Sequence, residues 1–105
     1  MTPAAKLQNY LRQRVEKSCG SYRKAQWVGR NGCPDCFIWW TWPVAAFVEI
    51  KAGRDRLSVV QGFEMDRMRA DGIPVYTART EADIDWIVEQ MLGMQKMLAT
   101  TSKLG

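Results

Sequence analysis

The sequence contains no histidine, and this absence removes several kinds of active site. Ser-His-Asp triads and Cys-His nucleophile pairs both need an imidazole as general base. Zinc sites built on histidine are excluded for the same reason. Any chemistry in this chain must therefore come from carboxylates, ammonium groups, amides or thiols.

Cysteine is scarce, with residues 19, 33 and 36 as the three examples. No basic-then-apolar signal segment precedes them, so we expect a reducing, intracellular setting. Cys33 and Cys36 form a CxxC pair, whose functional interpretations are a zinc site or redox work. Zinc would want four ligands and only Cys19 is left to join, while a redox pair would precede a helix rather than the strand expected here. The alternative is two packed, incidental thiols.

Long apolar runs are also missing. Residues 36–48 form the most apolar stretch, but it is too short to span a membrane and Pro43 interrupts it. There are no repeats, no linker and no glycine-rich phosphate loop, so we expect no membrane partner and no nucleotide cofactor. The length predicts one domain over residues 1–105, with a core at about 3–92 and a C-terminal extension at 93–105. The net charge of +4 indicates an acidic partner, usually nucleic acid, or serves only solubility.

Periodicity and turn residues predict an α/β fold in the order α-β-β-β-α-β-α, with a single mixed sheet flanked by helices. The expected helices cover residues 3–19, 57–71 and a segment that begins after a Thr80 cap. The expected strands cover residues 21–28, 35–41, 45–51 and 73–77. In the second helix we expect one broad apolar side that includes Val59, Val60 and Phe63, with Gln61 at its margin.

Three charged residues lie at the ends of two apolar, strand-like runs. Asp35 opens the first run, and Glu49 and Lys51 close the second, with Pro43 at the expected reversal. In a hairpin, Asp35 then lies beside Glu49, and the period of two places Glu49 and Lys51 on one face. Two carboxylates suit Mg²⁺ or Mn²⁺, and a nearby ammonium can hold a water or stabilise a phosphorane. The alternative is a solvated strand end next to a turn residue.

A family resemblance rests on four features in order. Residues 32–35 read Gly-Cys-Pro-Asp, residues 47–52 read Phe-Val-Glu-Ile-Lys-Ala, Gln61 follows on the next helix, and residues 72–76 read Gly-Ile-Pro-Val-Tyr. Together they resemble the VRR-NUC branch of the PD-(D/E)xK nuclease superfamily, with its restriction-endonuclease-like core. The similarity covers most of residues 4–78, close to a whole minimal domain as found in stand-alone viral members. It also implies phage or prophage origin and action inside a bacterial host.

The resemblance implies a metal-dependent DNA endonuclease. Mg²⁺ or Mn²⁺ would be held by Asp35, Glu49 and the backbone carbonyl of Ile50. Lys51 would position or activate the attacking water, and Gln61 would orient water or substrate. The competing hypothesis is a non-catalytic DNA-binding or phage assembly module that retains the fold, and RNA cleavage is a further enzymatic alternative.

The sequence departs from the family pattern in the first helix. Members carry a glutamate early in that helix, facing the metals, where this chain has Gln8 or Asn9. Either the third acid is missing, or Glu16 replaces it from a shifted register or from a partner subunit. One metal or two therefore remain alternatives.

Basic and apolar residues outside this set indicate partners. Lys24, Arg30, Arg54 and Arg56 are expected to contact DNA phosphates, and a solvated loop is the alternative for the last two. Three tryptophans gather near one hairpin end, and an apolar stripe runs into the tail. Their members are Trp39, Trp40 and Trp42, then Met91, Leu92, Met94, Met97 and Leu98. We expect these patches to form a homodimer, or else to close a small core, and the resemblance implies a dimer acting on branched DNA such as four-way (Holliday) junctions.

Overall fold

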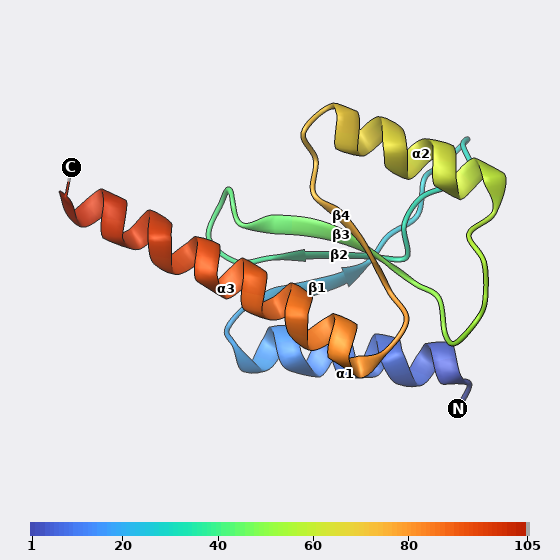
Figure 1. Cartoon of the computed structure of the whole chain (residues 1–105), viewed down its shortest axis with the longest axis horizontal. Helices are drawn as coiled ribbons and strands as arrows, with labels where there is room; N and C mark the ends of the chain where they lie inside the picture. The colour runs from blue at the N-terminus through green and yellow to red at the C-terminus, as the bar shows by residue number, and fades with distance from the viewer. Residues whose placement is uncertain (105) are drawn as a thin grey trace.

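A four-stranded sheet lies between two layers of helices (Figure 1). The structure is a computed structural model that describes residues 1–104, with side chains through residue 101. Its elements are α1 (Pro3–Lys17), β1 (Ser21–Lys24), β2 (Cys36–Trp39), β3 (Ala45–Ile50), α2 (Val59–Ala70), β4 (Val75–Ala78) and α3 (Glu81–Leu104). The predicted order α-β-β-β-α-β-α is confirmed.

The sheet is mixed, as predicted. Its strands follow the order β1-β2-β3-β4; β1 and β2 pair antiparallel, as do β2 and β3, whereas β3 and β4 are parallel. A parallel pair needs a crossover connection, and α2 supplies it. The hairpin pairs Cys36 with Val48, so the residues just before β2 meet the end of β3.

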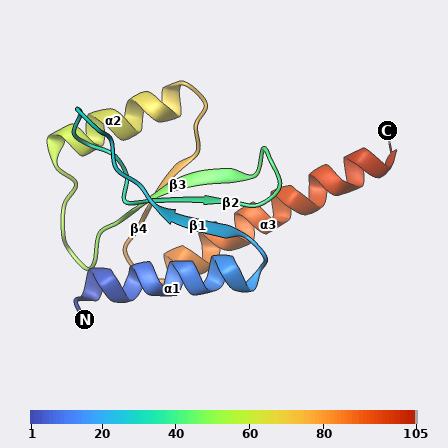
Figure 2. The same ribbon diagram turned by 180° about the vertical axis from the view of Figure 1, so that it is seen from behind.

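The two faces of the sheet bury different residues. Cys36, Ile38 and Val48 point toward α1 and α3, which form the main core with them. Phe37 and Phe47 point the other way, where α2 contributes Met65 and Met68 to a smaller cluster. Figure 2 shows from behind that α1 and α3 share one side of the sheet while α2 stands on the other. The second face is covered only in part.

Several predicted boundaries are corrected. The first strand ends at Lys24 rather than at residue 28. The Ala25 amide still donates to the Asp35 carbonyl at 2.8 Å, and the chain leaves the sheet after that bond. The first helix ends at Lys17 rather than at residue 19, since Cys19 takes a positive φ of 67°. The last strand covers Val75–Ala78, and the second helix begins at Val59 after its Ser58 cap.

The last helix continues through Gly93. The sequence predicted an end of the core at about residue 92, just before this glycine. A glycine costs about 1 kcal/mol in a helix interior, which does not terminate an otherwise favourable helix. The Thr80 cap is confirmed, because the Asp83 amide donates to Thr80 Oγ1 at 3.1 Å. The end of α3 projects beyond the sheet (Figure 1). Within the described residues, no helix combines the length and apolarity that a membrane span requires.

The tryptophans do not form one patch. Trp40 is buried in the main core and donates to Ser18, whereas Trp39 lies on the opposite face with the Arg23 guanidinium 5.0 Å from its ring. Of these three tryptophans, Trp42 is the one that is strongly exposed, at 80%. The apolar stripe of α3 divides in a similar way, because Met91 belongs to the core and Met97 is exposed.

The predicted apolar side of α2 is also wrong. Val59, Val60 and Phe63 are exposed, while the helix buries Glu64, Met65 and Met68. One of these three buried residues, Glu64, carries a carboxylate. A search for apolar residues at helical spacing therefore could not identify the buried face.

Candidate active site

Asp35 and Glu49 lie side by side because of the hairpin register. Cys36 is paired with Val48, so the preceding and following residues face each other. The Asp35 amide donates to Glu49 Oε1 at 3.0 Å, and the Ile50 amide donates to Asp35 Oδ2 at 3.0 Å. Each carboxylate is thus oriented by the backbone of the other strand, as the sequence predicted for their proximity.

Lys51 and Gln61 complete the group on the α2 side of the sheet. Lys51 Nζ lies 3.4 Å from Glu49 Oε2, and Gln61 Nε2 donates to the same oxygen at 2.6 Å. Glu49 is only 1% exposed, while Lys51 is half-buried. The structure therefore brings together the four side chains that sequence reasoning selected.

The start of α2 explains how Gln61 reaches Glu49. Ser58 Oγ accepts from the backbone N–H of Gln61 at 3.1 Å, and Gln61 Oε1 accepts from the backbone N–H of Ser58 at 3.1 Å. This capping box uses the side-chain oxygen of Gln61. The side-chain nitrogen, Nε2, is left free to donate to Glu49. One side chain both begins α2 and holds the buried carboxylate.

The electrostatics of the group leave negative charge in excess. Burial and the neighbouring Asp35 carboxylate raise the pKa of Glu49 to about 6, and Lys51 opposes this only in part. Two carboxylates against one ammonium leave one net negative charge at neutral pH. A bound cation would relieve that charge, so the donor set fits a divalent metal.

The donors that could hold a metal are few. Among the described residues, no three His, Cys, Asp or Glu side chains gather as a metal-binding cluster. Asp35, Glu49 and the carbonyl that ends β3 offer hard oxygen ligands. Mg²⁺ commonly completes such a set with water and substrate phosphate, so two protein carboxylates are sufficient for it.

The first-helix position is filled by a neutral side chain. An open pocket of about 440 Å³ beside Asp35 is lined by Gln8, Lys24, Ala25 and Gln26. Asn9 instead accepts a hydrogen bond from Arg12, and Glu16 pairs with Arg12 at 3.1 Å. Within this chain, Gln8 therefore occupies the place where the resemblance implied an acid, and Glu16 does not replace it.

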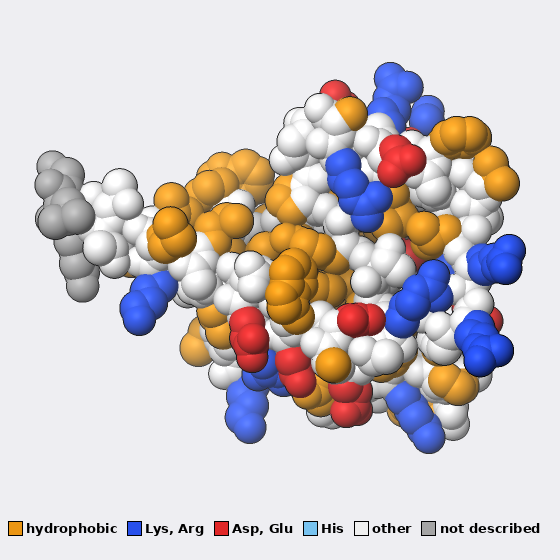
Figure 3. Space-filling view, viewed as in Figure 1, with side chains coloured by type: hydrophobic (Ala, Val, Ile, Leu, Met, Phe, Trp, Pro, Cys, Tyr) orange, Lys and Arg blue, Asp and Glu red, His pale blue; other side chains and the backbone are white. Residues whose placement is uncertain are grey.

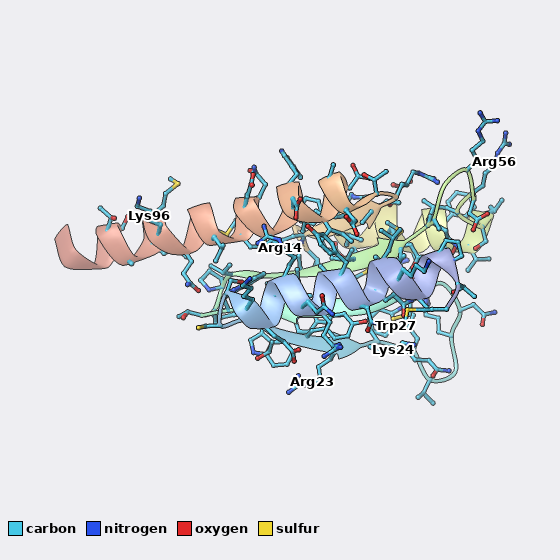
Figure 4. The ribbon with its side chains drawn as sticks, turned by 90° about the horizontal axis from the view of Figure 1, so that it is seen from below. Arg14, Arg23, Lys24, Trp27, Arg56 and Lys96 are labelled. Carbon is cyan, nitrogen blue, oxygen red and sulfur yellow. The ribbon has the colours of Figure 1, made fainter. Side chains whose placement is uncertain are left out.

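The predicted DNA-binding residues take two kinds of position. Lys24 lines the Asp35 pocket, and Arg54 and Arg56 are exposed on the loop directly after Lys51. Figure 3 shows Lys and Arg side chains gathered around that end of the molecule, and Figure 4 places Lys24 and Arg56 away from Lys96. Arg30 instead forms two hydrogen bonds to Glu64, at 2.9 and 3.2 Å.

Arg79 is a residue that sequence reasoning missed. Its guanidinium donates to the carbonyls of Gly53 and Asp55, and it thereby holds the loop that carries Arg54 and Arg56. No local pattern marks this role, because the contact joins the end of β4 to a loop 24 to 26 residues earlier.

The CxxC pair has the character of packed thiols. Cys36 is buried in the core with its sulfur 3.3 Å from Tyr22 Oη, and burial raises the pKa of its thiol to about 11. Burial likewise raises the pKa of Cys33, whose sulfur donates to the Pro34 carbonyl. Zinc binding and thiol redox work need thiolates, which both environments disfavour.

Comparisons with known proteins identify the family of this fold. A family model described as the VRR-NUC domain matches residues 3–82. A solved structure titled "VRR_NUC domain" superposes with a TM-score of 0.80 at 29% sequence identity, covering 85% of this chain and 97% of that one. No curated protein matches the chain. The family match spans most of the chain and the solved structure reproduces its fold, so the chain belongs to the VRR-NUC family of nuclease domains.

Proposed function

We propose that the chain is a metal-dependent endonuclease that hydrolyses phosphodiester bonds in DNA. The observation that carries this proposal is the convergence of Asp35, Glu49, Lys51 and Gln61 at one end of the sheet. Burying the Glu49 carboxylate beside a second, half-buried carboxylate, Asp35, is unfavourable for stability unless the charges are compensated. Such a costly arrangement is typical of an active site.

Each residue has a distinct part in this proposal. Asp35, Glu49 and the Ile50 carbonyl would hold Mg²⁺ or Mn²⁺, which supplies charge stabilisation and a more acidic bound water. Lys51 positions the attacking water and stabilises negative charge that develops on the phosphate. Gln61 fixes the orientation of Glu49 through its 2.6 Å hydrogen bond.

The surrounding cations support a DNA substrate. Lys24 is at the Asp35 pocket, and Arg54 and Arg56 follow the site directly in the chain. In this proposal they contact phosphates near the scissile bond without reading sequence. Arg30 contributes from its Glu64-bound position next to α2.

A homodimer acting on branched DNA is the finer form of the proposal. Trp42, Met97 and neighbouring apolar residues are exposed at the end of the molecule away from the carboxylates. An apolar groove of about 430 Å³ runs between Trp42, Phe47 and Met94 on the half-covered face of the sheet. Exposed apolar surface of this kind supports a second copy as partner, and two-fold symmetry would suit a four-way junction.

The test is cleavage of equal-length DNA substrates, namely a four-way junction, a linear duplex and a single strand, with an RNA strand added. We expect cutting with Mg²⁺ or Mn²⁺ and none with EDTA. Asp35→Ala, Glu49→Gln and Lys51→Ala should each lower the rate on the order of 100-fold or more, because several kcal/mol of transition-state stabilisation are lost. Glu89→Ala, a change of an exposed carboxylate on α3, is the matched control and should cut normally.

The outcomes separate the alternatives. Cleavage that persists in EDTA or in Glu49→Gln contradicts the metal mechanism. Metal-independent DNA binding with no cutting of any substrate favours a non-catalytic DNA-binding or phage assembly module. Equal cutting of junction and duplex leaves an endonuclease without structure selectivity, and preferential cutting of RNA reassigns the substrate.

A further inference from the structure

The outer surface of α2 exposes apolar side chains that the core does not use. Val59, Val60 and Phe63 are 73%, 50% and 71% exposed, respectively. They occupy neighbouring positions on the first two turns, so they form one patch rather than scattered residues. In Figure 3, apolar side chains appear at this end of α2 with Lys and Arg side chains nearby. Exposed apolar patches that are rimmed by polar groups mark interaction sites.

An open pocket of about 310 Å³ adjoins this patch. It is lined by Arg30, Asn31, Val60, Phe63, Glu64 and Arg67. The preceding loop packs closely on the helix, because a Cβ on Gly32 would lie 3.0 Å from the Val60 carbonyl oxygen. The two hydrogen bonds from Arg30 to Glu64 fix the guanidinium plane against the helix. The pocket thus combines a ring, a flat cation and an amide.

The charge of the pocket favours an anionic partner. Arg30 is balanced by Glu64, which is almost fully buried. Arg67 forms no ion pair with any residue whose side chain the structure describes, so it adds an uncompensated positive charge. A second copy of a chain with net charge +4 would bring further positive charge to this surface. A nucleic acid would bring phosphates instead.

The patch lies on the outer side of α2, whereas the Glu49 carboxylate lies on its inner side. Gln61 is on the same turn of α2 as Val60, and its side chain points inward to Glu49. A helix with its side chains is about 10 Å across, a length that about three steps of duplex DNA cover at 3.4 Å each along the duplex axis. A DNA strand with its phosphate at Glu49 can therefore present a nearby base to the outer face.

We propose that Phe63, with Val59, Val60, Arg30 and Arg67, binds an unpaired base of the DNA substrate about three nucleotides from the scissile phosphodiester. Aromatic rings and guanidinium planes stack on any base whose face is free, whereas paired bases are stacked within the duplex. This inference rests on the proposed nuclease function and adds a structural preference to it. DNA with unpaired bases near the cutting position would be selected by this surface.

The first experiment measures binding in EDTA, where cleavage does not interfere. Two duplexes of equal length are compared, one fully paired and one with a bulged 2-aminopurine, whose fluorescence falls on stacking. We expect tighter binding and quenching for the bulged duplex. Phe63→Ala should lower affinity for that duplex about 5- to 150-fold, the range that corresponds to about 1–3 kcal/mol for one stacked base. Affinity for the paired duplex should hardly change.

Three variants test the role of the ring. Phe63→Trp keeps an aromatic face and should retain the preference, whereas Phe63→Leu keeps apolar bulk and should lose the quenching. Trp86→Ala removes another exposed aromatic residue, on α3, and should behave like the wild type. Unchanged melting temperatures show that folding is intact. Equal loss of affinity for both duplexes, or no loss, overturns the proposal, as does a change of sedimentation in Phe63→Ala that marks a protein interface.

A second experiment separates this inference from the nuclease proposal. With Mn²⁺, the wild type should cut within about three nucleotides of the bulge, the distance given by the helix width, and Phe63→Ala should lose that placement. Cutting that ignores both the bulge and Phe63 overturns the base site and leaves the nuclease intact. Phe63-dependent quenching without any cutting overturns the nuclease and retains the base site.

Discussion

Glu49 combines three contacts that rarely meet at one carboxylate. It accepts from the Asp35 amide and from Gln61, it pairs with Lys51, and it is almost fully buried at the end of a central strand. These contacts orient the carboxylate without neutralising the pair that it forms with Asp35. Its pKa of about 6 reports that imbalance, because burial and Asp35 outweigh the stabilising ammonium.

The raised pKa predicts a pH dependence of stability without metal. The folded protein holds the Glu49 proton more tightly than the unfolded chain, whose pKa is near 4.5. The stability that the folded protein gains by binding this proton is therefore fully present below about pH 4.5. It is lost as pH rises to about 6. We expect a loss of up to about 2 kcal/mol, at 1.36 kcal/mol per pKa unit. Urea denaturation in EDTA between pH 4 and 8 measures it.

Glu49→Gln is the matched control for that measurement, since it removes the titration and keeps the shape. The wild type minus variant difference in unfolding free energy isolates the carboxylate from other titrating groups. A difference that is flat between pH 4 and 8 would show that Glu49 titrates normally. Adding Mn²⁺ at pH 7 should restore the lost stability in the wild type and not in the variant.

Sequence reasoning found the residues that strand geometry brings together. Asp35, Glu49 and Lys51 followed from a hairpin and its period of two, which need no knowledge of packing. Gln61 depended on the family resemblance, because a polar residue on a helix has no mark that distinguishes it from a surface residue. Gln8 remained one of three candidates, since the rotation of α1 over the sheet is set by core packing rather than by any local pattern.

At the scale of elements, α2 shows why its buried face was predicted wrongly. Its buried and inward-facing positions include Gln61 and Glu64, whose polarity hides the stripe completed by Met65 and Met68. These polar groups face inward because Glu49 and Arg30 satisfy them. The apolar residues of the first turns are left outside. The predicted C-terminal extension at residues 93–105 is, in the part that the structure describes, a continuation of α3.

The double role of Gln61 predicts different effects of two changes in the capping box. Ser58→Ala removes a cap and should lower the unfolding free energy by about 1 kcal/mol, with cleavage nearly unchanged. Gln61→Ala removes the cap contact and also a donor to buried Glu49, so it should cost about 1–3 kcal/mol more. Denaturation and single-turnover cleavage measure both variants. If the Ser58→Ala and Gln61→Ala variants cleave at the same rate, Gln61 does not orient Glu49 for cleavage.

At the scale of the whole molecule, the cations predict salt-dependent binding. Removing one cation that touches a phosphate should reduce the slope of log affinity against log salt by about 0.9 on duplex DNA. Arg54→Ala combined with Arg56→Ala should therefore lower the slope by about 1.8. Lys96→Ala, at the far end of α3, is the control and should leave it unchanged (Figure 4). Identical slopes for all three proteins would place the Arg54 loop outside the interface.

The exposed apolar end predicts self-association. Sedimentation at micromolar concentration should give a species of twice the 12.0 kDa chain mass. Trp42→Ser and Met97→Ser replace exposed apolar side chains and should shift the equilibrium toward monomer, because less apolar area is buried on association. Trp86→Ser, at a different part of α3, is the comparison. A clean monomer of wild type at these concentrations rejects the dimer.

The proposed site is also local along the chain. Its hydrogen bonds join residues 12 to 15 positions apart, from Asp35 to Gln61, whereas Tyr10 and Asp85, which join α1 to α3, are 75 positions apart. Closing the fivefold longer loop costs roughly 1.5 kcal/mol more chain entropy. The hairpin and the first turn of α2 can therefore order before the two outer helices meet. Asp35 and Glu49 would then come together early in folding, and the helical layer would close over the other face of a sheet that already carries them.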